Sequence, residues 1–490
     1  MLFKNCRKIL PLALLFCLLA VPGWGAETGD EERPVLDDSS TIEDYLAYAA
    51  LNNPGLEAAF LRWQAAVEGT AQAGTLPDPR FTYGYFIREV ETRVGPQRHR
   101  FGVSQSFPWS GTRQLRRDAA ALAAEAERQR YEAAKLDLFR RVKLAFHEYA
   151  YLARAIEITG ESVELMTWFE RAARARYKVG SANHADIIKA QVELARLEDR
   201  LVSLRDRLQP AATKLNSELN RERRAPLPLP GPGDDGPVAI DEAALYAAIG
   251  EAPRLEVINK SAEREQVAAE LARKGLYPGF TVSLEYLETG SALDPSTPDS
   301  GKDPLMAMVS VNIPLWRESS RAAEREARAR ENAALLRREE EQNRLGAKLD
   351  EALFALRDAE RKIALYGGSL LPKAHQSLEV TQKAYSAGKA GFIDLVDAQR
   401  TLLDFRLARE QAVADRAVRL AEIEEIAGVE LPRGGLPPDS RGRDDNLRDD
   451  RETRPGDALT GDTAANGRET RPGDPPAGPV AVTDHKGENQ

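Results

Sequence analysis

Four stretches of the chain alternate apolar with small or polar residues, and they predict β-strands. The alternating stretches fall at residues 81–90, 99–107, 280–288 and 305–313. A period of two with one apolar face is typical of a half-buried strand. Each stretch has about nine residues, enough for a tilted strand to cross a bilayer. Two soluble hairpins packed on helices would show the same alternation, so the strands alone leave both interpretations open.

Long helices are predicted next to the strands. From Thr112 to Tyr177 the chain has no proline and one internal glycine, Gly160. Apolar residues in this segment are spaced alternately by four and three, as in a coiled-coil seam, at Leu138, Val142, Ala145, Tyr149, Leu152 and Ile156. Such a helix would extend about 100 Å. The helices after Pro54 and Asn183 are shorter, and they can match that length only by stacking end to end.

The later helices carry the same kind of seam. After Asn183, leucines recur at Leu194, Leu197, Leu201, Leu204 and Leu208. In the second half of the chain, apolar residues recur at intervals of seven, at Leu349, Leu356, Ile363 and Leu370. Gly367, Gly368 and Pro372 interrupt that helix and predict a kink.

The two halves of the chain repeat each other. "YKVGSANHADIIKAQ" begins at Tyr177 and "YSAGKAGFIDLVDAQ" at Tyr385, each with Tyr-x-x-Gly followed by Asp and Ala-Gln. Other anchors recur in the same order, pairing Pro54 with Pro253, Phe81 with Phe280, Pro108 with Pro314, Gly160 with Gly368 and Gln191 with Gln399. Two structural repeats of roughly 200 residues explain this order, whereas chance similarity between Ala-rich helices does not. We place the repeats at residues 41–222 and 241–430.

The segments outside the repeats differ in composition. Residues 1–25 combine basic residues with the apolar run "ILPLALLFCLLA" and predict a signal peptide, with the mature chain starting at Ala26. An uncleaved anchor is the alternative, which the shortness of the run disfavours. Residues 26–40 form an N-terminal extension, and the Pro/Gly-rich residues 223–240 form a linker. Residues 431–490, which contain "RETRPGD" twice, predict a disordered tail.

Single residues give no sign of catalysis. The histidines are scattered without any metal-binding pair, at His99, His147, His184, His375 and His485. No Gly-rich phosphate loop or nucleophile elbow is present. Both cysteines, Cys6 and Cys17, lie in the leader, and bulky Phe16 argues against lipidation of Cys17. The net charge of −9 argues against a nucleic-acid partner. We therefore expect no enzyme activity, no cofactor and no bound metal.

The strands predict an oligomer if they lie in a membrane. Four strands cannot close a barrel, and open sheet edges are not tolerated in lipid. Two chains would supply eight strands, whose interior fills with side chains, and three would supply twelve, enough for a lumen. The alternative is a non-channel periplasmic coiled-coil adaptor or scaffold. An adaptor would need an additional lipoyl-like or β-barrel module, and the sequence predicts only hairpins.

These features together resemble the TolC-type outer-membrane efflux proteins, over roughly residues 41–429. The resemblance rests on the doubled Tyr-x-x-Gly signature, the internal repeat and the strand borders "PDPRF" and "FPWSG". "LPDPRF" and "VSQSFPWSGTR" are most similar to the branch that serves heavy-metal cation efflux. The resemblance implies an α+β membrane protein. In it, a homotrimer forms a twelve-stranded β-barrel above a helical periplasmic tunnel. It also implies contact with outer-membrane lipid, a periplasmic adaptor and an inner-membrane efflux pump.

The resemblance also implies a periplasmic gate. The family's gate motif corresponds here to Asp186, Tyr385, Asp394 and Asp397. Three copies of such acidic helix starts would gather negative charge around a narrow opening. The alternative for Asp186 and Asp394 is a simple helix-start role near the positive end of the helix dipole.

The turns that carry these residues differ from the family in one respect. Tyr177, Gly180 and Gly388 belong to the helix-turn tips, where glycine suits the left-handed helix stop. The family's gate also uses an arginine shortly after the second glycine. Here that position is Ala390, with Lys389 beside it, so we expect a different latching bond.

Overall fold

The computed structural model describes residues 36–431 except 38, 232–237, 239 and 295. The expected signal peptide, most of the N-terminal extension and all but one residue of the expected tail lie outside the described residues. In the first half, the elements are α1 (Ile42–Asn52), α2 (Pro54–Ala73), β1 (Arg80–Thr92), β2 (Gly95–Phe107), α3 (Thr112–Lys178) and α4 (His184–Glu218). In the second half, they are α5 (Glu242–Ile249), α6 (Pro253–Lys274), β3 (Gly279–Thr289), β4 (Leu305–Asn312), α7 (Arg317–Leu365), η1 (Tyr366–Leu370), α8 (Leu371–Ser386) and α9 (Phe392–Ala427).

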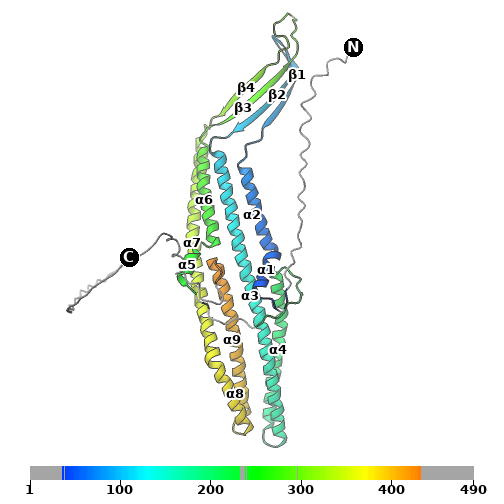
Figure 1. The fold of residues 1–490 in the computed structure, drawn as a ribbon, viewed down its shortest axis with the longest axis vertical. Coiled ribbons are helices and arrows are strands. Elements are labelled where there is room, and N and C mark those ends of the chain that lie inside the picture. Colours follow the sequence, from blue (N-terminus) through cyan, green and yellow to red (C-terminus); the bar gives the residue numbers. More distant parts are fainter. Residues whose placement is uncertain (1–35, 38, 232–237, 239, 295, 432–490) are drawn as a thin grey trace, which may run out of the picture. The chain divides into compact units, whose positions relative to one another are not determined.

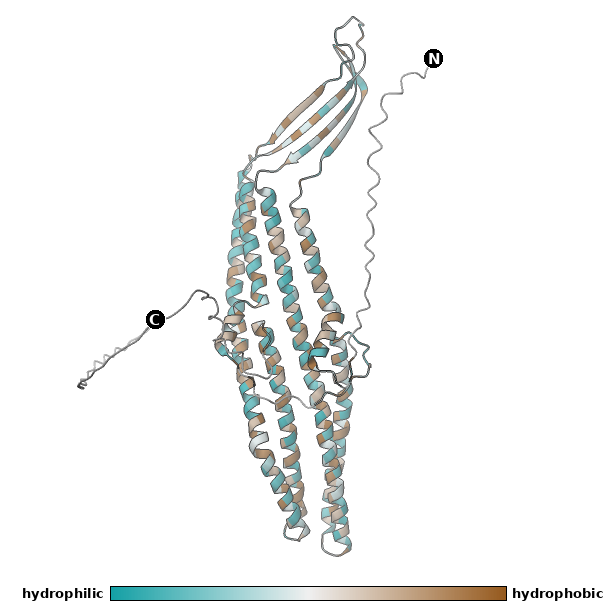
Figure 2. Ribbon diagram, viewed as in Figure 1, coloured by the Kyte–Doolittle hydropathy of each residue, from teal (hydrophilic) through white to brown (hydrophobic). Residues whose placement is uncertain are grey.

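The four strands form one antiparallel sheet in the order β1-β2-β3-β4. Their register places like residues beside one another: Val103 pairs with Phe81 and Leu284, and Val282 pairs with Val309. We define the apolar face of the sheet as Phe81, Tyr83, Phe101, Val103, Phe107, Phe280, Val282, Leu284, Tyr286, Leu305, Val309 and Val311. Apolar and polar bands alternate along these strands in Figure 2. The alternation predicted from sequence is therefore confirmed on all four strands.

The opposite face of the sheet is largely polar, although Met306 and Met308 of β4 also lie on it. Small and hydroxylated residues pair across it, such as Ser104 with Ser283 and Ser106 with Thr281. Arg100 on β2 also forms an ion pair with Glu285 on β3. A sheet with one apolar and one polar face suits a boundary between lipid and water.

The helices leave the sheet at one end and reverse at the other (Figure 1). α3 packs against α2, α4, α6 and α9. The expected end-to-end stacking is confirmed, because Asn53 Nδ2 donates to the Glu218 carbonyl at 2.9 Å and Asn220 Nδ2 to the Asn52 carbonyl at 3.0 Å. These bonds join the end of α4 to the start of α2. In the second half, Gly428 at the end of α9 similarly meets Pro253 at the start of α6.

The coiled-coil seam is buried as predicted over most of its length. Leu138, Val142, Ala145 and Leu152 are almost completely buried. Ile156 is only partly buried, and the seam passes instead through Ala155 and Ile158 to Phe169. None of the helices in the described part of the chain is both long and apolar enough to cross a membrane.

Two local features differ from the sequence-based expectation. The short helices α1 and α5, which precede Pro54 and Pro253, were not predicted, because eleven and eight residues are too few for a clear period. The interruption expected near Gly367 is a five-residue π-helix, η1. α8 then continues, with Pro372 in its first turn, where no intrahelical donor is needed.

One buried ion pair joins the two halves of the chain. Lys143 of α3 binds Glu424 of α9, and both side chains are 7% exposed. The Glu424 carboxylate also accepts a bond from the Leu431 backbone N–H at 3.3 Å. A buried charge that loses its partner is strongly destabilising.

We expect the variant Lys143→Met to lower the free energy of unfolding by about 3–5 kcal/mol, because the Glu424 carboxylate would stay buried without its cation. Adding Glu424→Leu should restore most of that loss by removing both charges. Denaturation in detergent, followed by the helical circular-dichroism signal, measures both variants. Lys383→Met, at the exposed Lys383–Glu379 pair, is the control and should change little. Equal losses in Lys143→Met and Lys383→Met would contradict a special role for the buried pair.

Candidate functional site at the helical turns

Two turns reverse the chain at the end of the helices that lies away from the sheet (Figure 1). In the α3–α4 turn, Gly180 has a φ of +79° and donates its N–H to the Tyr177 carbonyl at 2.9 Å. In the α8–α9 turn, Gly388 has a φ of +73° and donates to the Tyr385 carbonyl at 3.0 Å. Left-handed backbone at these positions favours glycine over any residue with a side chain. The predicted role of both glycines as helix stops is confirmed.

The two tyrosines that begin the repeated motif have different surroundings. Tyr177 is 46% exposed and its ring lies 5.4 Å from that of His184. Tyr385 is only 6% exposed and packs edge-on against Phe392 at 5.7 Å. Of the repeated pair, therefore, only the second tyrosine belongs to the core of the turn.

Arg176 connects the two turns. Its guanidinium donates to the Tyr385 carbonyl and lies 4.7 Å from the centre of the Tyr385 ring. The same side chain donates to the Ser181 carbonyl at 3.3 Å, within its own turn. A cation over an aromatic face and a charge-assisted bond to a carbonyl are both attractive. Arg176 therefore fastens the second turn to the first within one chain.

Charge and burial act together on Tyr385. Burial raises the pKa of its phenol, the Arg176 guanidinium opposes that shift, and the Asp186 carboxylate adds to it. A tyrosine with a raised pKa stays neutral at physiological pH. Its hydroxyl is buried and has no hydrogen-bond partner within the described part of the chain. Asp186, in the first turn of α4, therefore lies close enough to Tyr385 for its charge to act on the phenol.

Asp394 and Asp397 lie together on one face of α9. They line a shallow pocket between α8 and α9 with Ser377, Thr381 and Thr401. Asp394 accepts the Gly391 N–H at 2.8 Å and so caps the start of α9, which confirms the simpler helix-start role for this residue. Asp397 is exposed and lies 3.7 Å from Arg400 of the same helix.

Further from the turns, an ion pair with a nearly buried carboxylate joins α4 to α9. Glu193 of α4 binds Arg400 of α9, and this bond raises the pKa of the guanidinium. Among the residues that the structure describes, no group of three or more His, Cys, Asp or Glu side chains is placed to hold a metal ion.

The sequence analysis did not identify Arg176, Glu193 or Arg400. Comparison of the two repeats could have identified Arg176. Its counterpart in the second repeat is Ala384, so the arginine is present in only one of the two turns. An arginine present in only one of two otherwise matched turns is a candidate for contact between them. In this structure the arginine that contacts the second turn is Arg176 of the first repeat.

The fold and the paired turns define a class of internally duplicated helical proteins with a four-stranded sheet. The chain matches the family described as "Outer membrane efflux protein" over residues 46–221 and 244–429, one match for each half. It belongs to this family. The family and fold are those of a channel protein of the bacterial outer membrane with a periplasmic extension.

Individual relatives agree with this assignment. The cobalt-zinc-cadmium resistance protein CzcC of Cupriavidus metallidurans is 23% identical over 434 residues, covering 86% of this chain and 99% of the relative. The outer membrane protein VceC of Vibrio cholerae is a similar solved structure, with a TM-score of 0.64, 17% identity and coverage of 79% of this chain and 96% of VceC. CusC is another, with a TM-score of 0.66, 15% identity and coverage of 79% and 92%.

Proposed function

We propose that three copies of this chain form the outer-membrane duct of a tripartite efflux system. The observation that carries the proposal is the family match of both halves, combined with a four-stranded sheet that has an apolar face. Three sheets would give twelve strands around a lumen, with the apolar face toward lipid and the polar face inward. The helices would continue that lumen into the periplasm, where an adaptor and an inner-membrane pump would dock.

The family match sets aside the scaffold alternative. A periplasmic coiled-coil scaffold would need neither the strands nor their continuous apolar face. That face carries exposed side chains such as Val309 and Phe81. Exposed apolar area of this extent is costly in water and favourable in lipid.

We further propose that the two turns form the periplasmic gate, as the positions of Asp186, Tyr385, Asp394 and Asp397 suggest. Threefold symmetry would bring six turns around one axis. The exposed carboxylates of Asp394 and Asp397 would then form an acidic ring that favours cations. Arg176 would hold the two turns of each chain together in the closed state.

Opening the gate should change conduction measurably. The double variant Asp394→Ala with Asp397→Ala should raise single-channel conductance in planar bilayers, because it removes the cap of α9 and the carboxylates that would help to hold the proposed gate closed. Block by multivalent cations should weaken in the same variant. Arg176→Gln should also raise conductance, because it releases the second turn from the first.

Helix α3, which carries Arg176, offers a matched control for the Arg176 variant. Arg171 is exposed and makes no ion pair within the described part of the chain, so Arg171→Gln should conduct like the unaltered protein. Unchanged conductance and cation block in correctly assembled Asp394 and Asp397 variants would leave these residues as helix caps only. An equal effect of Arg171→Gln and Arg176→Gln would remove Arg176 from the gate.

For the cargo, we propose metal cations. The support is the relative named for cobalt, zinc and cadmium resistance and the strand-border motifs described above. The duct itself needs no metal site for this role, because an acidic entrance concentrates cations without binding them tightly.

Deleting the gene should lower the growth-inhibiting concentrations of cobalt, zinc and cadmium several-fold, while those of dyes and antibiotics stay unchanged. Growth assays across such a panel measure this, and complementation with the intact gene is the control. Sensitivity to dyes and antibiotics with normal metal tolerance would reject metal cargo but keep the duct. Normal tolerance of every compound would count against an efflux role.

A further inference from the structure

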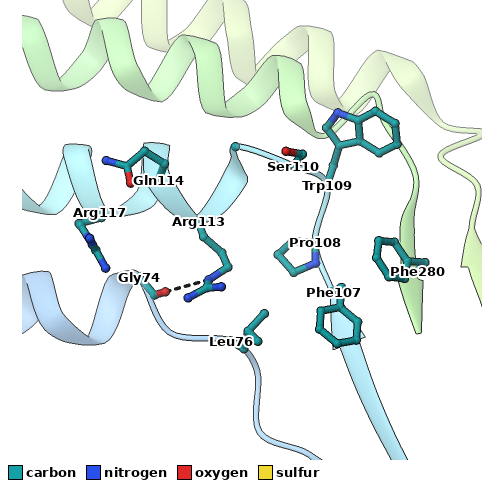
Figure 3. A pocket seen from close by; sticks show the side chains of 11 residues that line it. Gly74, Leu76, Phe107, Pro108, Trp109, Ser110, Arg113, Gln114, Arg117 and Phe280 are labelled. Carbon is teal, nitrogen blue, oxygen red and sulfur yellow. Dashed lines mark hydrogen bonds between the residues drawn. The ribbon is translucent and has the colours of Figure 1, made fainter. Parts of the chain in front are cut away.

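A pocket of about 500 Å³ opens where the sheet meets the helices (Figure 3). It lies between the C-terminal end of α2, the first two turns of α3 and the ends of the two central strands. The side chains on which the inference rests are Leu76, Phe107, Trp109, Arg113, Arg117 and Phe280. This volume is within the usual range for small-ligand pockets.

The strand register shows which side of the sheet the pocket is on. Phe107 pairs directly with Phe280, and their rings stack at 5.2 Å. Both belong to the apolar face, so the pocket opens on the side of the sheet that faces lipid in the proposed duct. The floor of the pocket is therefore continuous with the surface that contacts acyl chains.

Further aromatic side chains lie near the pocket, where the strands meet the helices. Trp109 stacks on Tyr277 at 5.1 Å, just beyond the ends of β2 and β3. Trp316, at the start of α7, is largely exposed. Tryptophan and tyrosine favour the headgroup level of a bilayer, where one part of the ring is apolar and another is hydrated. The pocket thus lies where lipid headgroups meet water on the periplasmic side.

The wall of the pocket is cationic. Arg113 and Arg117 stand one turn apart on α3 and so on the same face. The Arg113 Nε donates to the Gly74 carbonyl at 2.9 Å, which fixes the guanidinium beside the pocket (Figure 3). Arg117 packs against the same glycine.

Arg113 and Arg117 have no carboxylate partner among the residues that the structure describes. Within the described residues, neither Arg113 nor Arg117 forms an ion pair. The acid nearest along the helix, Asp118, accepts a bond from Gln114 at 2.7 Å. Lys274 lies beside Gly111 at the start of α3 and adds positive charge, and the first turn of α3 contains no acidic residue. Guanidinium groups held in this way match the geometry of a phosphodiester.

We propose that this pocket binds the phosphodiester of an anionic phospholipid from the periplasmic leaflet of the outer membrane. Arg113 and Arg117 would bind the phosphate oxygens, Trp109 would lie at the glycerol level, and Phe107 and Phe280 would contact the upper acyl chain. The proposal rests on the membrane orientation given under the proposed function. Each chain would carry one such site, so the lipid would occupy a fixed place at the junction of strands and helices.

Native mass spectrometry of the intact assembly in detergent tests this site with palmitoyl-oleoyl phosphatidylglycerol as the probe. The unaltered protein should retain this lipid more strongly than the zwitterionic phosphatidylcholine of the same chains. The double variant Arg113→Gln with Arg117→Gln should bind phosphatidylglycerol at least about tenfold more weakly. Arg113→Lys with Arg117→Lys keeps the charge but not the planar fork, and should fall between the two.

A matched double control separates a site from general surface charge. Arg116→Gln with Arg321→Gln removes the same charge near the same end of α3 and α7 without altering the pocket lining, and should bind like the unaltered protein. Equal weakening in this control would overturn the proposal in favour of diffuse attraction. Displacement of the lipid by millimolar inorganic phosphate would also overturn it, because the site would then bind a free anion. Absence of a preference for phosphatidylglycerol in the unaltered protein, together with normal conductance and metal tolerance, would reject this site and leave the proposed duct intact.

Discussion

The structure depends on one constraint, which is that the backbone of a strand in lipid must find all its hydrogen-bond partners in protein. The described sheet runs β1-β2-β3-β4, so β1 and β4 are its two edges. Each edge presents a row of N–H and C=O groups that lipid cannot satisfy. The duplication of the chain contributes one hairpin from each half to a single sheet, but four strands still cannot close on themselves. In the proposed duct, other copies of the chain close the sheet, and the helices and turns become shared walls around one axis.

The periodic parts of this fold could be predicted from sequence. Period two with one apolar face identified all four strands, and spacings of four and three identified α3 and its buried seam. Strands β1 and β2 extend beyond the predicted stretches, toward their connecting turn at Val94. The register shifts between Tyr85 and Val90, within the last part of the predicted stretch of β1, and the alternation is lost from there toward the turn. Backbone pairing holds that part of the hairpin together, and backbone pairing leaves no pattern in the sequence.

At the functional site, the residues of the turns show what could and could not be predicted from sequence. Gly180, Gly388 and Asp394 could be assigned because a turn and a helix start impose local requirements that recur in each repeat. The contact of Arg176 with Tyr385 could not, because it joins residues from different repeats through tertiary packing. Tyr385 contacts both Arg176 and Phe392 and is buried, whereas Tyr177 is exposed. Differences between matched repeats are therefore where function-specific contacts are to be sought in duplicated chains.

The number of chains in the assembly tests the account most directly. Native mass spectrometry of the protein extracted from outer membranes in mild detergent gives that number without reference to any structure. The account predicts a mass of three mature chains that persists at low protein concentration, since twelve strands close the sheet and enclose a lumen. A stable monomer would contradict the account, because the edges of β1 and β4 would then lack partners. A dimer would contradict it as well, because eight strands would leave no open passage.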